Sequence, residues 1–327
     1  MEPMLSLPLI AARIIHFAST VIVAGAVVFP ILISAPVLRG SGDRTGAASL
    51  YSRLRVIAWA SLAISVVSGA VWLVFLVTNI TGSSLAQVIS DGTARTFLAR
   101  TQFGHAWDAR LVLALLLAVA LLRFKRAAGW PSAEGLIAPA LAMGFLGALA
   151  WSGHGGATPG LRGDIHVAAD ALHLVAAGAW IGGLLPLGLL LSSVEKLPGA
   201  AGLGIAHDAA SRFSTLGIAA VATLIVTGLI NTWVLVGSVA ALVDFQYGRL
   251  LLVKITLFLV MVAVAAFNRI QLTPRLTAPA AGGSQASLDA LRRLRRNCFV
   301  ETALGLAILF VVGALGSMSP GMDMQEP

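Results

Sequence analysis

Long apolar stretches separated by short polar segments recur along the whole sequence. A helix needs about 20 consecutive, mainly apolar residues to cross the hydrocarbon core of a bilayer. By that measure the pattern predicts an all-α fold, a polytopic membrane helical bundle of about eight transmembrane helices. We place these helices at roughly 8–36, 55–80, 107–124, 134–152, 166–192, 212–238, 249–270 and 298–316.

The composition agrees with a membrane protein. Of the 327 residues, 58% are hydrophobic and only 11% are charged. A soluble domain carries about 25% charged residues, so this chain has too little polar surface to stay in solution. The first apolar stretch has no basic residue before it and extends past the length of a signal-peptide core, so we expect it to be retained as the first span.

The basic residues are distributed unevenly between alternate loops. A net charge of +8 would suggest nucleic-acid binding in a soluble protein. Here fifteen Lys and Arg residues lie in one set of loops, which includes the segment LRRLRR at 291–296, and four lie in the other set (Arg95, Arg100, Arg162 and Arg249). Loops on the cytoplasmic side carry such an excess. We therefore predict that both termini are extracytoplasmic, with the lipid bilayer and no nucleic acid as partner.

The two halves of the sequence share motifs in the same order. Arg110 follows Gln102-Phe103-Gly104, and Lys254 follows Gln246-Tyr247-Gly248 at the same interval. Further matches pair His16 with His173, Ser68-Gly69 with Thr227-Gly228, and Trp72 with Trp233. Since each unit contains an even number of crossings, the halves are predicted to be two parallel four-helix repeats. They cover residues 1–152 and 153–327, and the second ends in a short Met-containing outer tail, 317–327.

The equivalent cations Arg110 and Lys254 allow two interpretations. Both fall just inside the predicted outer face, where a long basic side chain can extend to the membrane interface. A charged group at that depth can instead belong to a functional site. The sequence leaves both possibilities open.

Histidines and one carboxylate gather at the predicted outer face of the fifth helix. His166, Asp170 and His173 are spaced i, i+4 and i+7, which places them on one side of the helix. His154 lies just before them in a Gly-rich turn. Imidazole and carboxylate groups suit Cu(II), Zn(II) and other first-row ions. We predict a metal site here, with His16 and His105 at the same face as further candidates. The alternative is a polar network that only joins helices.

Methionines add a softer set of ligands. Met318, Met322 and Met324 lie in the outer tail after the last predicted span. Thioethers bind Cu(I), so we include these three residues in the predicted metal site. An incidental cluster in the tail is the alternative. Cys298 is the only cysteine, so no intrachain disulfide is possible.

The sequence contains no nucleotide-binding glycine motif, no Gly-x-Ser-x-Gly motif and no Cys-x-x-Cys motif. It therefore indicates neither direct use of ATP nor a recognisable catalytic centre. We predict a transporter or metal-binding membrane protein that is not an enzyme.

The second half contains five distinctive motifs: Trp-Ser-Gly-His-Gly-Gly-Ala at 151–157, Asp-Ala-Leu-His at 170–173, Thr-Gly-Leu-Ile-Asn-Thr-Trp at 227–233, Tyr-Gly-Arg-Leu-Leu-Leu-Val-Lys at 247–254 and Asn-Arg at 268–269. Together they resemble the CopD copper-resistance family of bacterial inner-membrane proteins. The resemblance is most specific over about 150–276, which we term the CopD-like core. It is looser over the first half.

The resemblance implies a multi-pass inner-membrane protein that takes copper, as Cu(I) or Cu(II), from the periplasm and moves it toward the cytoplasm. It also implies a separate CopC-like periplasmic copper-binding protein as partner. His154, Asp170 and His173 fall on the family's His-containing turn and its Asp-x-x-His helix. His154 stands in Gly-His-Gly where the family pattern is Gly-His-Ala, a change that we expect to affect flexibility more than ligation.

Two other functions fit the same residues. Helical bundles that carry His at equivalent depths also bind haem by bis-His ligation, with His16 and His173 as the axial ligands of an electron-transfer protein or oxidoreductase. A copper sensor or assembly factor that does not transport the metal is the other alternative.

Overall fold

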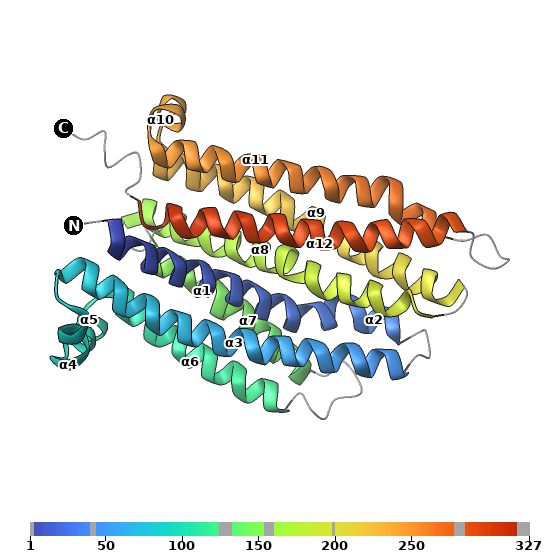
Figure 1. Ribbon diagram of the computed structural model, residues 1–327, viewed down its shortest axis with the longest axis horizontal. Helices are drawn as coiled ribbons and strands as arrows, with labels where there is room; N and C mark the ends of the chain where they lie inside the picture. The colour runs from blue at the N-terminus through green and yellow to red at the C-terminus, as the bar shows by residue number, and fades with distance from the viewer. Residues whose placement is uncertain are drawn as a thin grey trace.

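The computed structural model describes residues 3–39, 44–123, 133–153, 160–197, 200–277 and 285–318. Every regular element in these residues is helical. The long helices lie side by side along the longest axis of the molecule (Figure 1). This arrangement satisfies all backbone hydrogen bonds within each helix, as a hydrocarbon environment requires.

In the described residues, the first half contains four long or medium helices and three short ones. Helix α1 (Pro3–Phe29) continues through the π-helical turn η1 (Pro30–Ser34) into α2 (Ala35–Leu38), and α3 spans Arg44–Thr81. The short helices α4 (Leu85–Ser90) and α5 (Thr93–Arg100) precede α6 (Gln102–Arg123). Helix α7 (Ile137–Gly147) lies between the 3₁₀ turns η3 (Ala133–Leu136) and η4 (Ala148–Ser152).

The second half repeats this order. Helices α8 (Gly160–Val194) and α9 (Ala200–Val236) are followed by the short helix α10 (Val239–Asp244). Helix α11 (Gln246–Phe267) then continues through the π-helical turn η6 (Asn268–Leu272) and the 3₁₀ turn η7 (Thr273–Leu276). Helix α12 spans Gln285–Leu315.

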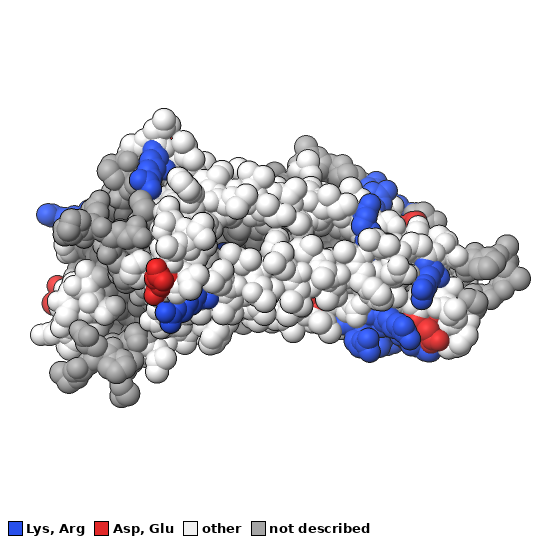
Figure 2. All heavy atoms as spheres, turned by 90° about the horizontal axis from the view of Figure 1, so that it is seen from above, with Lys and Arg blue, Asp and Glu red and all other residues white. Residues whose placement is uncertain are grey.

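The prediction of a polytopic helical bundle is confirmed. Seven helices in the described residues are long and apolar enough to cross a membrane. The fourth predicted span, 134–152, corresponds to the shorter apolar segment Ile137–Ser152. Charged side chains lie mainly toward the two ends of the molecule, with a broad band free of them between (Figure 2). That band has the surface expected for contact with lipid.

Equivalent helices of the two halves pack against each other at the centre. Gly25 lies nine residues after His16 in α1, and Gly182 lies nine residues after His173 in α8. A Cβ atom added to Gly25 would collide with the backbone of Gly182, and one added to Gly182 would collide with the carbonyl of Val21. Such close approach of small residues is typical of helix contacts in membranes. Gly25 and Gly182, which the predicted repeat makes equivalent, thus lie together.

The short helices α5 and α10 also occupy equivalent places. Each folds back onto the glycine that opens the next long helix. A Cβ atom on Gly104 would collide with the backbone of Leu98, and one on Gly248 with the backbone of Leu242. Both short helices lie at the end of the bundle where α1 begins (Figure 1). We call this the terminal end. The boundary between the halves at residue 152 remains a prediction.

Candidate functional site

Asp170 and His173 lie on the same side of α8 near the terminal end, and α9 provides a polar partner for each. The Asn231 Nδ2 atom donates to Asp170 Oδ1 at 3.3 Å. The His173 Nδ1 atom lies 2.9 Å from Thr227 Oγ1. Both side chains are therefore held by hydrogen bonds from a neighbouring helix within an otherwise apolar bundle.

The hydrogen bonds of Thr227 define the tautomer of His173. The Thr227 hydroxyl donates its one proton to the carbonyl of Thr223 at 2.6 Å, so toward His173 it accepts. His173 Nδ1 must then carry the proton, and Nε2 keeps its lone pair. The described residues make no hydrogen bond to Nε2. A neutral imidazole oriented in this way has the form that ligates a transition metal.

Helix α11 brings a cation and a phenol to the same place. Lys254 is close enough for its positive charge to act on both Asp170 and His173. It forms none of the ion pairs found in the described residues. Tyr247 is buried and lies within electrostatic range of Asp170. We call Asp170, His173, Thr227, Asn231 and Lys254 the α8 site.

Two of the predicted ligands flank this site in the sequence. His166 is buried, one helical turn before Asp170 on α8. His154 lies outside the described residues, but a Cβ atom on the preceding residue, Gly153, would lie 3.9 Å from Asp170 Oδ2. Gly153, the residue before His154, therefore lies next to the carboxylate of Asp170.

The remaining predicted ligands are farther apart or outside the described residues. His105 is exposed near the start of α6. Met318 packs at the terminal end against the apolar cluster that includes Tyr247. Met322 and Met324 lie outside the described residues. Within the parts of the chain that the structure describes, no three His, Cys, Asp or Glu side chains come together as a metal site.

His16 occupies the equivalent position in the first half, but both of its ring nitrogens are engaged. Arg110 Nη2 lies 2.7 Å from Nε2. Because arginine only donates, Nε2 accepts, and Nδ1 donates to the carbonyl of Ser65 at 2.8 Å. Trp72 and Trp107 pack around the imidazole with ring centroids 5.5 and 5.7 Å away. This arrangement leaves no free imidazole nitrogen for a metal ion or a haem iron.

The residue three positions before each histidine differs in charge. Arg13 precedes His16 and Asp170 precedes His173 by the same interval. The Arg13 guanidinium lies over the Trp72 ring, 5.0 Å from its centroid, and donates to the carbonyl of Gly316 in the last described turn. The first half thus has two buried guanidinium groups where the second has a carboxylate and one amine.

The predicted match between Trp72 and Trp233 is wrong. Trp72 lies four residues after Ser68, so its equivalent four residues after Thr227 is Asn231. Trp72 is 1% exposed, whereas Trp233 is 72% exposed. Two further residues on a helix rotate a side chain by about 200°, which turns Trp233 away from the bundle. The aromatic core of the first half is therefore replaced by a polar contact in the second.

Sequence reasoning missed Thr227 as part of the α8 site, and it missed Tyr247 as a neighbour of that site. The sequence left two possible roles for Lys254, at the membrane interface or in the site, and the structure places its charge within electrostatic range of Asp170. The repeated Ser/Thr-Gly pair was the available signal for Thr227. A Cβ atom on either glycine would face an imidazole, at 3.0 Å from His16 Cε1 for Gly69 and at 3.6 Å from His173 Cε1 for Gly228.

Comparison with known families and proteins identifies related sequences. The family model "Copper resistance protein D-like, N-terminal domain" matches residues 4–164, and the model "Copper resistance protein D" matches residues 207–315. The chain is 32% identical to Copper resistance protein D of Pseudomonas syringae pv. tomato, over 88% of this chain and 89% of that protein.

Two further relatives are more distant. Identity to Inner membrane protein YebZ of Escherichia coli (strain K12) is 28%, over 97% of this chain and 100% of the relative. Identity to Copper transport protein CutJ of Bacillus subtilis (strain 168) is 29%, over 75% of this chain and 42% of the relative. No solved structure matches the chain.

Proposed function

The chain belongs to the copper resistance protein D family, and from this premise we propose that it binds copper at the α8 site and moves it across the bacterial inner membrane toward the cytoplasm. Asp170 and His173 are the ligands from the described residues. His154, beside Gly153, is the third ligand. The observation that carries the proposal is the pair of hydrogen bonds at Thr227, from which the tautomer of His173 follows. Its Nε2 atom receives no hydrogen bond from the described residues, and Asp170 lies one helical turn away.

Lys254 has a defined role in this proposal. An isolated carboxylate in the membrane costs several kcal/mol, and the positive charge of Lys254 offsets that cost while the site is empty. A copper ion that reaches Asp170 replaces this charge and repels the amine. Lys254 therefore competes with the metal, which favours release as well as capture.

The surroundings of the α8 site support an entry route from the periplasm. The site lies near the terminal end, opposite the end with the denser basic surface, where Arg292 and Arg295 pair with Glu195. By the positive-inside rule the terminal end is periplasmic. The Met-containing tail and a separate CopC-like protein would deliver copper there. The membrane potential or an ion gradient drives passage, since the sequence has no ATP-binding motif.

Copper binding and uptake by two variants test the assignment. Asp170→Asn and His173→Ala should each lower copper affinity by about 100-fold, because each removes a ligand from a small set. Uptake into proteoliposomes should fall in parallel. His105→Ala is the matched control, because His105 is exposed near the same end of the bundle, and it should retain binding and uptake.

The outcomes separate the alternative functions. Wild-type copper content in both purified variants would reject the α8 site. Stoichiometric copper binding without uptake would indicate a sensor or an assembly factor. A Soret band in the purified protein would indicate haem, which the hydrogen bond between Arg110 and His16 Nε2 opposes at that position.

A further inference from the structure

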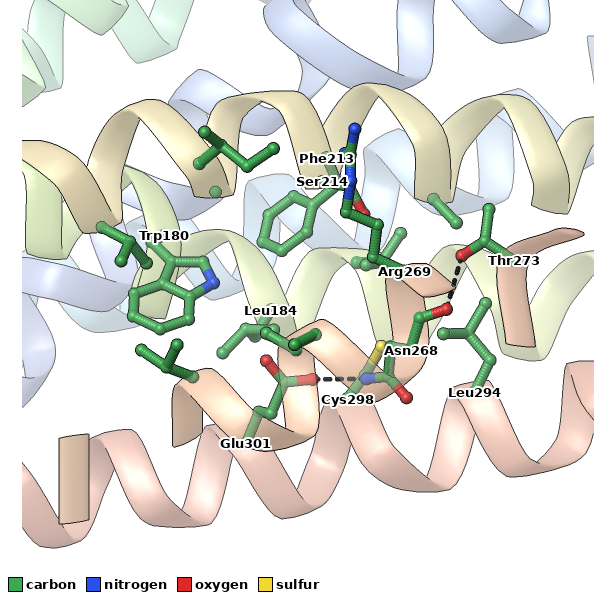
Figure 3. Close-up of a pocket in the computed structure, with 18 of the residues that line it drawn as sticks. Trp180, Leu184, Phe213, Ser214, Asn268, Arg269, Thr273, Leu294, Cys298 and Glu301 are labelled. Atoms are coloured by element: carbon green, nitrogen blue, oxygen red, sulfur yellow. Dashed lines mark hydrogen bonds between the residues drawn. The ribbon is translucent and has the colours of Figure 1, made fainter. Parts of the chain in front are cut away.

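A second polar group lies farther along the helices that carry the α8 site. Helices α8, α9, α11 and α12, with the turns η6 and η7, line a partly open pocket of about 350 Å³, shown in Figure 3. Its walls are mainly apolar, with Trp180 and Leu184 on one side and Phe213 on another. Glu301 and Cys298 of α12 line the same pocket.

Glu301 is a buried carboxylate with only part of its bonding capacity used. It is 2% exposed, and Asn268 Nδ2 donates to its Oε1 atom at 2.6 Å. The described residues provide no ion pair to it. Arg269 lines the pocket but is exposed. An acidic group inside a membrane bundle is expensive to bury, and it marks ion pathways more often than packing contacts.

The amide that binds Glu301 is itself held in place. Asn297 Nδ2 donates to Asn268 Oδ1 at 2.7 Å, and Thr273 Oγ1 donates to the Asn268 carbonyl at 2.9 Å. Asn268 opens the π-helical turn η6, and such turns occur frequently at functional sites. The carboxylate therefore has a fixed position at the edge of the pocket.

Cys298 provides a soft ligand next to this carboxylate. It precedes Glu301 by three residues, so both side chains leave α12 on the same side. It is 1% exposed and is the only cysteine of the sequence. Because a thiolate binds Cu(I) strongly, the pocket combines the sulfur ligand of a soft cation with a carboxyl group that Asn268 holds in place.

We propose that Cys298 and Glu301 form a second binding site, for a soft monovalent cation such as Cu(I), which accepts the metal after it leaves the α8 site. The proposal rests on the transport direction proposed above. Binding breaks the S–H bond and forms an S–Cu bond, and the proton leaves to solvent. No electron is transferred. Cu(I) replaces the proton on the Cys298 sulfur, and both carry one positive charge, so the net charge of Cys298 with its bound ion is unchanged. Glu301 provides the oxygen ligand.

The spacing along the helices sets the distance between the two sites. Lys254 and Asn268 are fourteen residues apart on α11 and its π-helical extension, which corresponds to about 20 Å at 1.5 Å per residue. Trp180 lies seven residues after His173 on α8, about 10 Å along the axis. It packs edge-on against Phe258 of α11. Trp180 thus stands between the sites, at the wall of the inner pocket.

Cu(I) titration of the full-length protein in lipid nanodiscs tests the inner site. Because the chain has one cysteine, the ultraviolet thiolate-to-Cu(I) charge-transfer band reports this site alone. We expect the band in the wild type and its loss in Cys298→Ser. Glu301→Gln, which keeps an acceptor for Asn268, should weaken binding about tenfold as measured against a chromophoric Cu(I) chelator. Ser214→Ala, a change at another pocket residue, should leave the band unchanged.

The experiment distinguishes failure of this site from failure of the α8 site. His173→Ala should lose the ion bound at the α8 site and keep the charge-transfer band. If the wild type shows no such band, or if Glu301→Gln binds Cu(I) as tightly as the wild type, the inner site is rejected. If the band persists while copper bound at the α8 site is missing from the wild type itself, the outer assignment fails and the inner one stands.

Discussion

The two halves of the protein place a histidine at the same position and surround it differently. In the first half His16 lies between Trp72 and Trp107, accepts from Arg110 and has Arg13 three residues before it. In the second half His173 has Asp170 at that earlier position, and the described residues leave its Nε2 atom without a hydrogen bond. One scaffold therefore supports a cationic, aromatic core in one half and an open ligand in the other.

The difference suggests separate roles for the two histidine groups, helix packing for one and ligand binding for the other. Guanidinium groups repel an incoming cation and need no metal, so the His16 group suits the role of an anchor between helices. It also ties the two ends of the chain together, because Arg13 donates to the carbonyl of Gly316. The α8 site keeps the same hydroxyl-to-imidazole contact but has a carboxylate nearby, which attracts a cation. In the proposed function only the α8 site needs an open ligand.

The most direct way to break the comparison is to make the second half resemble the first. Asp170→Arg copies the charge of Arg13 and places a guanidinium beside Lys254. We expect copper uptake into proteoliposomes to fall to background, a loss of 100-fold or more, because a ligand is removed and a repulsive cation added. Detergent-extracted yield and helical circular dichroism monitor folding. Substantial uptake by a folded Asp170→Arg variant would refute the role of Asp170.

Much of the fold can be predicted from the sequence, because each membrane crossing requires an apolar stretch of a minimum length. Apolar length predicts each crossing, and only the fourth span, Ile137–Ser152, is shorter than the rule requires. Motif spacing predicts the equivalence of His16 with His173. The i, i+3 spacing of Asp170 and His173 places both on one side of α8 before any contact is known. The crossings, the equivalence of the two histidines and the placement of Asp170 with His173 depend only on residues within one helix or on matching motifs in the two halves.

The contacts between helices are harder to predict, because they depend on how each helix is rotated and packed. Thr227 determines the tautomer of His173 from another helix, and no spacing within α8 indicates it. The same limit explains the false pairing of Trp72 with Trp233, one buried and the other facing outward. Cys298 appears isolated in the sequence, and only the packing of α11 on α12 places Asn268 against its neighbour Glu301.

A smaller change sharpens the comparison at the imidazole itself. Thr227→Val removes the acceptor of His173 Nδ1–H and frees the ring to rotate or change tautomer. We expect about a tenfold loss of copper affinity, typical for the loss of a group that orients a metal-binding histidine. The matched control is Ser68→Ala at the equivalent position near His16, where Ser65 still accepts from Nδ1.

Ser68→Ala should leave copper affinity unchanged within error, since His16 carries no metal in this interpretation. Isothermal titration of both variants against a competing chelator measures the difference. Equal losses in the two variants would mean that the halves contribute alike, which would contradict the division proposed above. If copper affinity is unchanged in both variants, Thr227 is not part of the copper site.

The outer methionines should have the smallest effect, and they test whether the tail serves the open half. Met318 packs at the terminal end against the cluster that includes Tyr247, and Tyr247 lies within electrostatic range of Asp170. Replacing Met318, Met322 and Met324 together by Leu keeps the apolar volume and removes the thioethers. We expect uptake at limiting copper to fall about threefold, because the tail raises the local copper concentration without forming the main site, and saturating copper should restore it. Met261→Leu, a buried change in the core, is the control. If both variants behave alike at limiting copper, the tail methionines only pack, and capture depends on the α8 site alone.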